Sequence, residues 1–263
     1  MRTIRELSSL GGRRVLLTGG AGHVGLAAAE SLIELGARVV LLDLDKRACE
    51  ERAAALGDRA LPLACDLSDE QEARLAVRQA IEMLGGLDVL IHCAAYVGTT
   101  QRPGWAVPFE QQSVAAWDSA LRVNLTAAFV MAQEGHAALR ASGHGTIVLF
   151  ASIYGLVGPD PALYAGTALA NPTAYGVSKG GLMQLTRYLA TQMGPHVRVN
   201  AIAPGGVLRA QPDMFRERYE ARTPLGRMAV EEDLKGAVAY LASDLSSYVT
   251  GHTLVVDGGL TAW

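Results

Sequence analysis

The chain has 263 residues, of which 50% are hydrophobic and 29 are glycine, so it can bury a substantial core between many tight turns. Its formal net charge of -3 argues against nucleic acid and against an anionic membrane as a partner. No run of 18 apolar residues and no signal-peptide pattern occurs, so we expect a soluble, cytoplasmic protein.

Apolar runs alternate with helical periods along the chain. Seven runs predict buried strands at residues 14–18, 38–43, 60–65, 87–93, 146–151, 197–203 and 253–256. The amphipathic stretches between them predict helices near 24–36, 46–57, 69–84, 113–141, 174–193 and 230–242. This alternation is typical of a seven-stranded parallel sheet with helices on both faces. Without a linker or repeat, residues 1–263 are predicted to form a single doubly wound α/β domain.

Two segments rich in proline and glycine break this rhythm, at residues 153–172 and 204–224. Both follow strands at the carboxyl edge of the predicted sheet. Doubly wound folds bind their ligands at that edge, so we interpret both segments as substrate loops.

A cluster of glycines follows the first predicted strand, in the run Thr18-Gly19-Gly20-Ala21-Gly22-His23-Val24-Gly25. Glycines let the backbone turn sharply and approach a pyrophosphate at the N-terminus of the next helix. A tight turn without a ligand is the alternative, but the place between a strand and a helix favours a dinucleotide site. The candidate contacts are Gly19, Gly22, His23, Val24 and Gly25.

Acidic residues follow the next two strands. Asp43 lies 18 residues after Gly25, where a carboxylate binds the adenosine ribose hydroxyls and repels a 2′-phosphate, which favours NAD over NADP. Asp43 could instead cap the next helix, a role open to Asp45 as well. Asp66 and Leu67 could seat the adenine, with Asp66 on its amino group, and a capping role for Asp66 stays open.

Only three of the 23 basic residues are lysines, and one of them, Lys179, lies four residues after Tyr175. On a helix this spacing puts both side chains on one face, one turn apart. An ammonium beside a phenol stabilises the phenolate, so the pKa of Tyr175 is expected to fall toward neutrality. Such a pair suits proton transfer to or from an alcohol oxygen. A surface tyrosine that happens to precede a lysine is the alternative.

The three cysteines, Cys49, Cys65 and Cys93, are scattered without the spacing of a zinc site or a disulfide framework. We expect buried small residues at Cys65 and Cys93, and no metal site.

With these features in order, the chain resembles the single-domain branch of the short-chain dehydrogenase/reductase family over nearly its whole length. Further matches are Asn124 in Arg122-Val123-Asn124-Leu125, Ser152 after Leu149-Phe150-Ala151, the Pro204-Gly205 turn, and the ending Thr250-Gly251-His252-Thr253-Leu254-Val255-Val256-Asp257-Gly258-Gly259. The resemblance implies a Rossmann-like fold and hydride exchange with a nicotinamide cofactor. It also implies cofactor contacts at Tyr175 and Lys179 and at Cys93, Ala94, Ala95, Pro204, Gly205 and Val207.

The resemblance further assigns four catalytic positions. Ser152 would bind the substrate oxygen and Tyr175 would exchange its proton. Lys179 would lower the pKa of Tyr175 and hold the nicotinamide ribose, and Asn124 would anchor a water that links Lys179 to solvent.

Three departures from the family pattern stand out. His23 replaces a glycine, and His92-Cys93-Ala94-Ala95 replaces Asn-Asn-Ala-Gly, both of which look more like the sugar-nucleotide epimerase branch. Arg209 stands where the family often has a threonine that holds the nicotinamide amide.

The substrate loops resemble those of family members linked to flagellin or surface-polysaccharide sugar modification, and residues 256–263 resemble sugar-acid and polyol dehydrogenases. Both imply a small polar carbohydrate, with an anionic sugar included. Arginine forks suit phosphate or carboxylate, so the arginines after the sixth strand either bind an anion or form a solvated helix face. They are Arg209, Arg216, Arg218, Arg222 and Arg227.

The main prediction is therefore an NAD-dependent oxidoreductase for a sugar-like alcohol. The alternatives are a 3-oxoacyl or aliphatic ketone reductase, a sugar epimerase-like enzyme and a non-catalytic nucleotide sensor. The resemblance also implies a homotetramer in which the helices at 113–141 and 174–193 form one interface.

Overall fold

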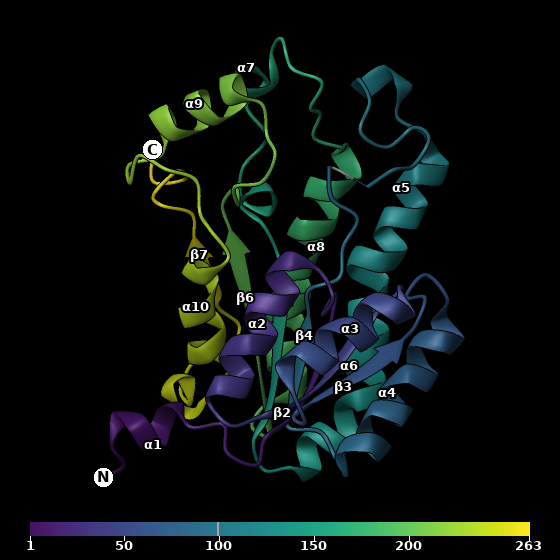
Figure 1. Cartoon of the computed structure of the whole chain (residues 1–263), viewed down its shortest axis with the longest axis vertical. Helices are drawn as coiled ribbons and strands as arrows, with labels where there is room; N and C mark the ends of the chain where they lie inside the picture. Colours follow the sequence, from purple (N-terminus) through teal and green to yellow (C-terminus); the bar gives the residue numbers. More distant parts are fainter. Residues whose placement is uncertain (99) are drawn as a thin grey trace.

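The computed structural model describes residues 1–98 and 100–263. All seven predicted strands are present, and they form one parallel sheet (Figure 1). Their bounds are β1 (Arg14–Thr18), β2 (Arg38–Asp43), β3 (Ala60–Ala64), β4 (Val89–His92), β5 (Gly145–Phe150), β6 (Val197–Pro204) and β7 (Thr253–Val256). The order across the sheet is β3-β2-β1-β4-β5-β6-β7, as expected for a doubly wound fold.

Each predicted helix is also present within a few residues. The α-helices are α1 (Ile4–Ser8), α2 (His23–Glu34), α3 (Lys46–Leu56), α4 (Glu70–Leu84), α5 (Val114–Leu121), α6 (Ala127–Ala141), α7 (Pro161–Tyr164), α8 (Thr173–Met193), α9 (Asp213–Arg222) and α10 (Glu232–Ala242). Single turns occur at η1 (Phe109–Gln111), η3 (Ile153–Gly155) and η4 (Asp244–Ser246), and a π-helical turn at η2 (Arg122–Thr126).

The core forms two layers because neighbouring residues of a strand point to opposite faces of the sheet. In β1, Val15 and Leu17 pack with α2 and α10, whereas Leu16 packs with α4, α6 and α8 on the other face. Both faces are buried, which explains why the strands are continuous apolar runs in the sequence.

Short side chains fix where the helices begin. Asp45, Asp69 and Ser113 accept hydrogen bonds from the first turns of α3, α4 and α5. Helix α1 was not predicted, although Thr3 and Glu6 form the capping box that marks its start. Helix α7 was also missed, because it lies in a segment interpreted as a loop, whereas α9 is a helix that carries arginines after the sixth strand, one of the two alternatives stated for them.

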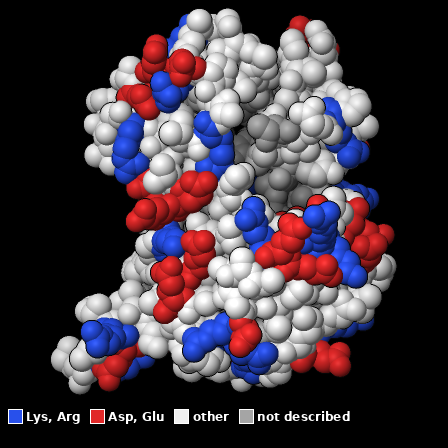
Figure 2. All heavy atoms as spheres, viewed as in Figure 1, with Lys and Arg blue, Asp and Glu red and all other residues white. Residues whose placement is uncertain are grey.

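On the face drawn in Figure 2, the described acidic and basic side chains are interspersed rather than gathered into one patch of a single charge. Within the described residues, no helix is long and apolar enough to cross a membrane.

Candidate active site

The sheet order creates a crevice where the direction of winding reverses. From β1 the chain moves outward to β2 and β3, and it then returns to β4 on the other side of β1. The carboxyl ends of β1 and β4 are therefore the expected ligand position. Figure 1 shows α7 and α9 beyond the ends of β6 and β7, so both predicted substrate loops lie at this edge.

The glycine turn after β1 is built for close backbone contact. Gly19 has φ +68°, and a Cβ there would lie 2.7 Å from the Ala94 nitrogen. A Cβ on Gly25 would lie 2.0 Å from the Gly19 carbonyl oxygen. Gly22 is the N-cap of α2 and brings no side chain to its first N–H groups. The turn thus forms a backbone cradle at a helix N-terminus, which fits a dinucleotide pyrophosphate.

Thr18 joins this turn to the end of β4. Its hydroxyl oxygen accepts hydrogen bonds from the N–H groups of Cys93 and Ala94, both at 3.1 Å, and lies 3.1 Å from His92 Nδ1. With its oxygen occupied by two donors, the hydroxyl donates its proton to Nδ1, which leaves the imidazole proton on Nε2. Burial lowers the pKa of His92 to about 3, so the ring is neutral. Thr18 is a site residue that the sequence analysis did not single out.

Asp43 and Asp66 are not helix caps, because Asp45 and Asp69 fill those roles. The Asp43 carboxylate accepts hydrogen bonds from the Ala21 N–H at 3.1 Å and from the Leu44 N–H at 2.8 Å. These two bonds fix the carboxylate behind the glycine turn. The Asp66 carboxylate accepts the Ser68 N–H at 2.8 Å. The capping alternatives are therefore wrong. The Leu67 side chain is buried in the core, so a cofactor contact at Leu67 would have to come from its backbone.

Ser152, Tyr175 and Lys179 come together beyond β5. Ser152 is buried and begins η3, which packs against α8. A Cβ on Gly155 would lie 2.7 Å from the Lys179 backbone carbonyl carbon, so the glycine permits this contact. Lys179 is 3% exposed, and its Nζ donates to the Phe150 carbonyl at 2.6 Å. Tyr175 lies one turn earlier on α8, and its phenol is near enough to Ser152 that the serine side chain acts to lower its pKa.

The predicted fall in the pKa of Tyr175 is wrong for this structure. Burial raises the pKa of the phenol, and the hydrogen bond from Ser152 offsets only part of that effect. The Lys179 Nζ lies 5.6 Å from the centre of the Tyr175 ring and is directed to Phe150, so it does not reverse the shift. Burial instead lowers the pKa of Lys179 itself to about 8.

Asn124 lies in the π-helical turn η2 and is fully buried. Its amide nitrogen donates to Ser178 at 3.0 Å, and its amide oxygen accepts the Tyr96 N–H at 2.7 Å. Its side chain therefore holds α8 and the segment after β4 together. A water contact would have to come from the backbone, which a π-helical turn leaves with an unusual hydrogen-bond pattern.

The walls of the crevice continue after β6, which ends at Pro204. The Gly205 N–H donates to the Val256 carbonyl at 2.9 Å, and a Cβ there would lie 2.9 Å from the Asp257 Cα. Val207 pairs with Ala229 in an isolated bridge. The predicted contacts Pro204, Gly205 and Val207 thus form one strip held by backbone pairing, and Cys93, Ala94 and Ala95 follow β4 at the same edge of the sheet.

A family model described as enoyl-(acyl carrier protein) reductase matches residues 19–261. The chain belongs to the short-chain dehydrogenase/reductase family. It is 36% identical to cis-4-hydroxycyclohexanecarboxylate dehydrogenase of Sinomonas cyclohexanicum, with 95% of this chain and 97% of the relative covered. It is 35% identical to an L-rhamnose 1-dehydrogenase (NAD(P)(+)) of a Sphingomonas strain, with the same coverage.

A solved short-chain dehydrogenase from Leptospira borgpetersenii with bound NAD⁺ superposes with a TM-score of 0.86. It shares 31% identity, and the match covers 99% of this chain and 96% of that one. This short-chain dehydrogenase/reductase is thus an oxidoreductase with the expected Rossmann-like fold, and the family uses a nicotinamide cofactor.

Most arginines after β6 contact the protein itself. In α9, Arg218 donates to the carbonyls of Ala162 and Ala165, and Arg222 forms an ion pair with Asp160. Arg216 pairs with Asp213 at 3.0 Å, and Arg227 pairs with Asp233 at 2.6 Å. Arg218 and Arg222 thus fasten α9 to α7, and we call the two helices together the lid. The interpretation of these four arginines as anion ligands is not supported.

Arg209 and His23 share one carboxylate. The Arg209 Nη1 atom lies 2.8 Å from Glu231 Oε1, and the His23 Nδ1 atom lies 3.8 Å from the same oxygen. Glu231 therefore links the glycine turn to the loop after β6. Two of the three departures from the family pattern meet at this point.

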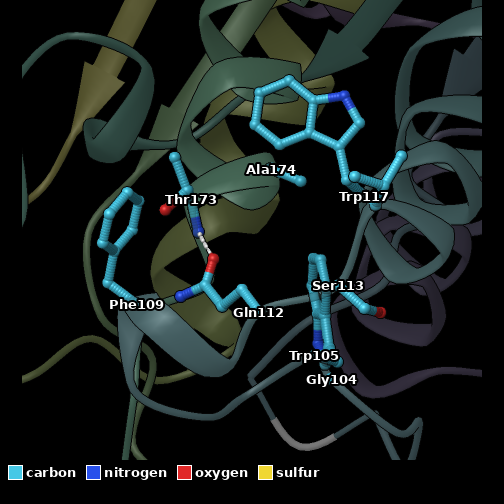
Figure 3. Close-up of a pocket in the computed structure, with 9 residues that line it drawn as sticks. Gly104, Trp105, Phe109, Gln112, Ser113, Trp117, Thr173 and Ala174 are labelled. Atoms are coloured by element: carbon cyan, nitrogen blue, oxygen red, sulfur yellow. Dashed lines mark hydrogen bonds between the residues drawn. The ribbon is translucent and has the colours of Figure 1, made fainter.

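An apolar pocket of about 200 Å³ lies at the start of α8 (Figure 3). Its walls include Trp105, Phe109 and Trp117, and the Gln112 side chain accepts the Thr173 N–H at 3.0 Å. Trp105 is buried and was not anticipated from the sequence, and Trp117 packs against the same small core. None of Ser152, Tyr175 and Lys179 lines this pocket.

Proposed function

We propose that the protein is an NAD-dependent dehydrogenase that interconverts a secondary alcohol and a ketone on a sugar, a polyol or a related cyclic alcohol. The observation that carries the proposal is the meeting of Ser152, Tyr175 and Lys179 beside the crevice that the glycine turn lines. The names of the sugar and cyclic-alcohol dehydrogenases among the relatives support the substrate class.

Each polar group would have a distinct task. The buried Ser152 hydroxyl would donate a hydrogen bond to the substrate oxygen, and the Tyr175 phenol would exchange the alcohol proton. Lys179 would hold the nicotinamide ribose hydroxyls. The positive charge of its ammonium would repel other positive charge in the site. Bound NAD would supply the hydride acceptor. Because burial raises the pKa of Tyr175, the phenol is ready to donate in reduction, and oxidation should speed up as the pH rises.

Asp43 supports the preference for NAD. Its carboxylate is held behind the glycine turn by two backbone N–H groups, at the place where the adenosine ribose would lie. A 2′-phosphate would meet this negative charge at close range. Replacement of Asp43 with Asn should weaken NAD binding and strengthen NADP binding, measured by quenching of tryptophan fluorescence. Equal preference for the two cofactors in the unaltered protein would contradict this role.

Tyr175→Phe tests the catalytic assignment. We expect NAD binding to stay near normal while oxidation of any accepted alcohol falls by orders of magnitude, because the proton acceptor is lost. Tyr188→Phe is the matched control, since Tyr188 is 58% exposed on the same helix. Retained turnover in Tyr175→Phe would refute the assignment.

The apolar pocket beside α8 and the family model's description keep an acyl ketone reductase as the second candidate. It would use NADPH and reduce 3-oxoacyl thioesters rather than oxidise polyols. Release of stoichiometric NADH would exclude an epimerase-like cycle, and nucleotide binding without any turnover would favour a sensor.

A homotetramer is part of the proposal. Large apolar side chains remain exposed on α5, α6 and α8, among them Val114, Phe129 and Val177. Helices that form a subunit interface need such a face. Light scattering on the purified protein gives the oligomeric state directly.

A further inference from the structure

A cluster of phenols joins η3 to the lid, close to Tyr175. The hydroxyl oxygens of Tyr154 and Tyr164 lie 2.6 Å apart, and the Asn171 side-chain nitrogen donates to Tyr164 at 3.4 Å. Tyr164 is also near enough to Tyr175 that its phenol contributes to the raised pKa of that residue. The Tyr154 N–H also donates to the Ser152 hydroxyl oxygen at 3.2 Å, so the cluster lies beside the place where the proposed substrate oxygen would bind.

The hydrogen bonds within this cluster leave at least one donor and at least one acceptor unused. Two phenols carry two protons, and their mutual hydrogen bond uses only one of them. The Asn171 amide donates through its nitrogen, and no partner for its oxygen is found among the described residues. An amide offers one donor side and one acceptor side whichever way it is turned, so this count does not depend on the assignment of its atoms.

A neighbouring donor and acceptor match a hydroxyl group better than other ligands. A hydroxyl both donates and accepts, whereas a carboxylate or phosphate only accepts. The two arginines that reach α7, Arg218 and Arg222, do not balance an anion in the cluster either, because Ala162, Ala165 and Asp160 hold them.

The surrounding lid holds Tyr164 in place. Its ring packs against Phe215, with centroids 5.3 Å apart, and Phe215 in turn packs against Tyr219. The Thr167 hydroxyl donates to the Tyr164 carbonyl at 2.8 Å. A polar group that is positioned before the substrate arrives loses little entropy on binding it.

We infer that Tyr164, supported by Tyr154 and Asn171, binds a second hydroxyl group of the substrate, so that the enzyme selects neutral polyols over simple alcohols. This inference rests on the proposed function. It assigns Tyr164 and Asn171 as specificity-determining residues for that reaction.

The test compares NAD-linked oxidation of 1,2-cyclohexanediol and cyclohexanol, which differ by one hydroxyl group. The unaltered enzyme should prefer the diol in kcat/KM by about 10- to 100-fold, the discrimination expected for one hydrogen-bonded hydroxyl. Tyr164→Phe should lose that preference by slowing the diol, while kcat/KM for cyclohexanol changes by about twofold or less. Tyr248→Phe, at a fully exposed tyrosine, is the matched control.

Each result has a distinct meaning. Equal kcat/KM for the two alcohols in the unaltered enzyme would overturn the inference without any variant. An equal loss for both alcohols in Tyr164→Phe would assign the residue a structural role only, and would leave the proposed function intact. If neither compound nor any sugar is oxidised although NAD binds, the proposed function fails first. Should Tyr164→Phe be unfolded by circular dichroism, Asn171→Ala must show the same selective loss for the diol, or the inference is wrong.

Discussion

Lys179 offers a prediction in which stability and activity oppose each other. The residue is 3% exposed, and among the described residues its ammonium has one hydrogen-bond acceptor, the Phe150 carbonyl. Burial lowers its pKa from 10.5 to about 8. The folded protein therefore holds this proton less tightly than the unfolded chain does, and a buried charge at neutral pH costs folding free energy.

The magnitude follows from linkage. A fall in pKa from 10.5 to about 8 corresponds to about 3 kcal/mol of folding free energy at neutral pH. Between about pH 8 and 10.5 the unfolded chain binds more protons than the folded one, so the free energy of unfolding rises with pH across this window. Removal of the ammonium relieves that cost but leaves the Phe150 carbonyl without its donor, a loss of about 1–3 kcal/mol.

Lys179→Met should therefore be about as stable as the unaltered protein at pH 7, although it should be inactive. From pH 7 to 10.5, the unaltered protein should gain about 3 kcal/mol over the variant. For a chain of this size that is on the order of 10 °C in Tm.

Thermal unfolding followed by circular dichroism at matched protein concentration, without nucleotide, measures this difference. The surface variant Lys46→Met is the control, because that side chain is 78% exposed and its unfolding curve should follow the unaltered protein at every pH. If the Tm of Lys179→Met also changes with pH as the Tm of the unaltered protein does between about pH 7 and 10.5, burial does not lower the pKa of Lys179 and the reasoning is wrong.

Two further predictions concern the backbone cradle and a buried ion pair. Gly25→Ala should abolish NAD binding in a fluorescence titration, because its Cβ would lie 2.0 Å from the Gly19 carbonyl oxygen. The control is Gly236→Ala in α10, where a Cβ would have no atom within 4 Å. This variant should bind NAD normally and gain about 0.5–1 kcal/mol in the free energy of unfolding. Binding by Gly25→Ala at normal affinity would show that the turn can move. Asp88→Asn should lose about 3 kcal/mol in urea unfolding at pH 7, because the 4% exposed carboxylate accepts the backbone N–H, Nε and Nη2 of Arg14. The Arg14 side chain holds the pKa of Asp88 below 3.8, so the difference should shrink only in strong acid; an unchanged urea midpoint at pH 7 would contradict the pair's role.

The sheet and the meeting of the polar residues could be predicted because each lies at the end of a clearly apolar run. Once the strands are parallel and alternate with helices, the residues after β1, β4, β5 and β6 must gather at one edge. Ser152 and Tyr175 therefore become neighbours through topology, although they are 23 residues apart in the sequence.

The remaining features depend on tertiary contacts that no local pattern records. Helix α9 is rich in charged residues. Its Phe215 and Tyr219 are buried because they pack against α7, a contact that the sequence of α9 does not reveal. Arg218 and Arg216 look alike in the sequence, yet one binds backbone carbonyls of α7 and the other a neighbouring aspartate. The direction of the Lys179 ammonium depends on how closely η3 packs on α8, so the pKa shift of Tyr175 could not be foreseen.

The lid also has a mechanical consequence. Its first helix follows the strand that ends near Ser152, and its second follows the strand that ends at Pro204. Since Arg218 and Arg222 of α9 fasten the two helices together, we expect α7 and α9 to move as one unit. In the proposed complex, admission of an alcohol would then also disturb the strip from Pro204 to Val207, which is predicted to contact the cofactor. Such coupling favours compulsory-order kinetics, with the dinucleotide entering first and leaving last.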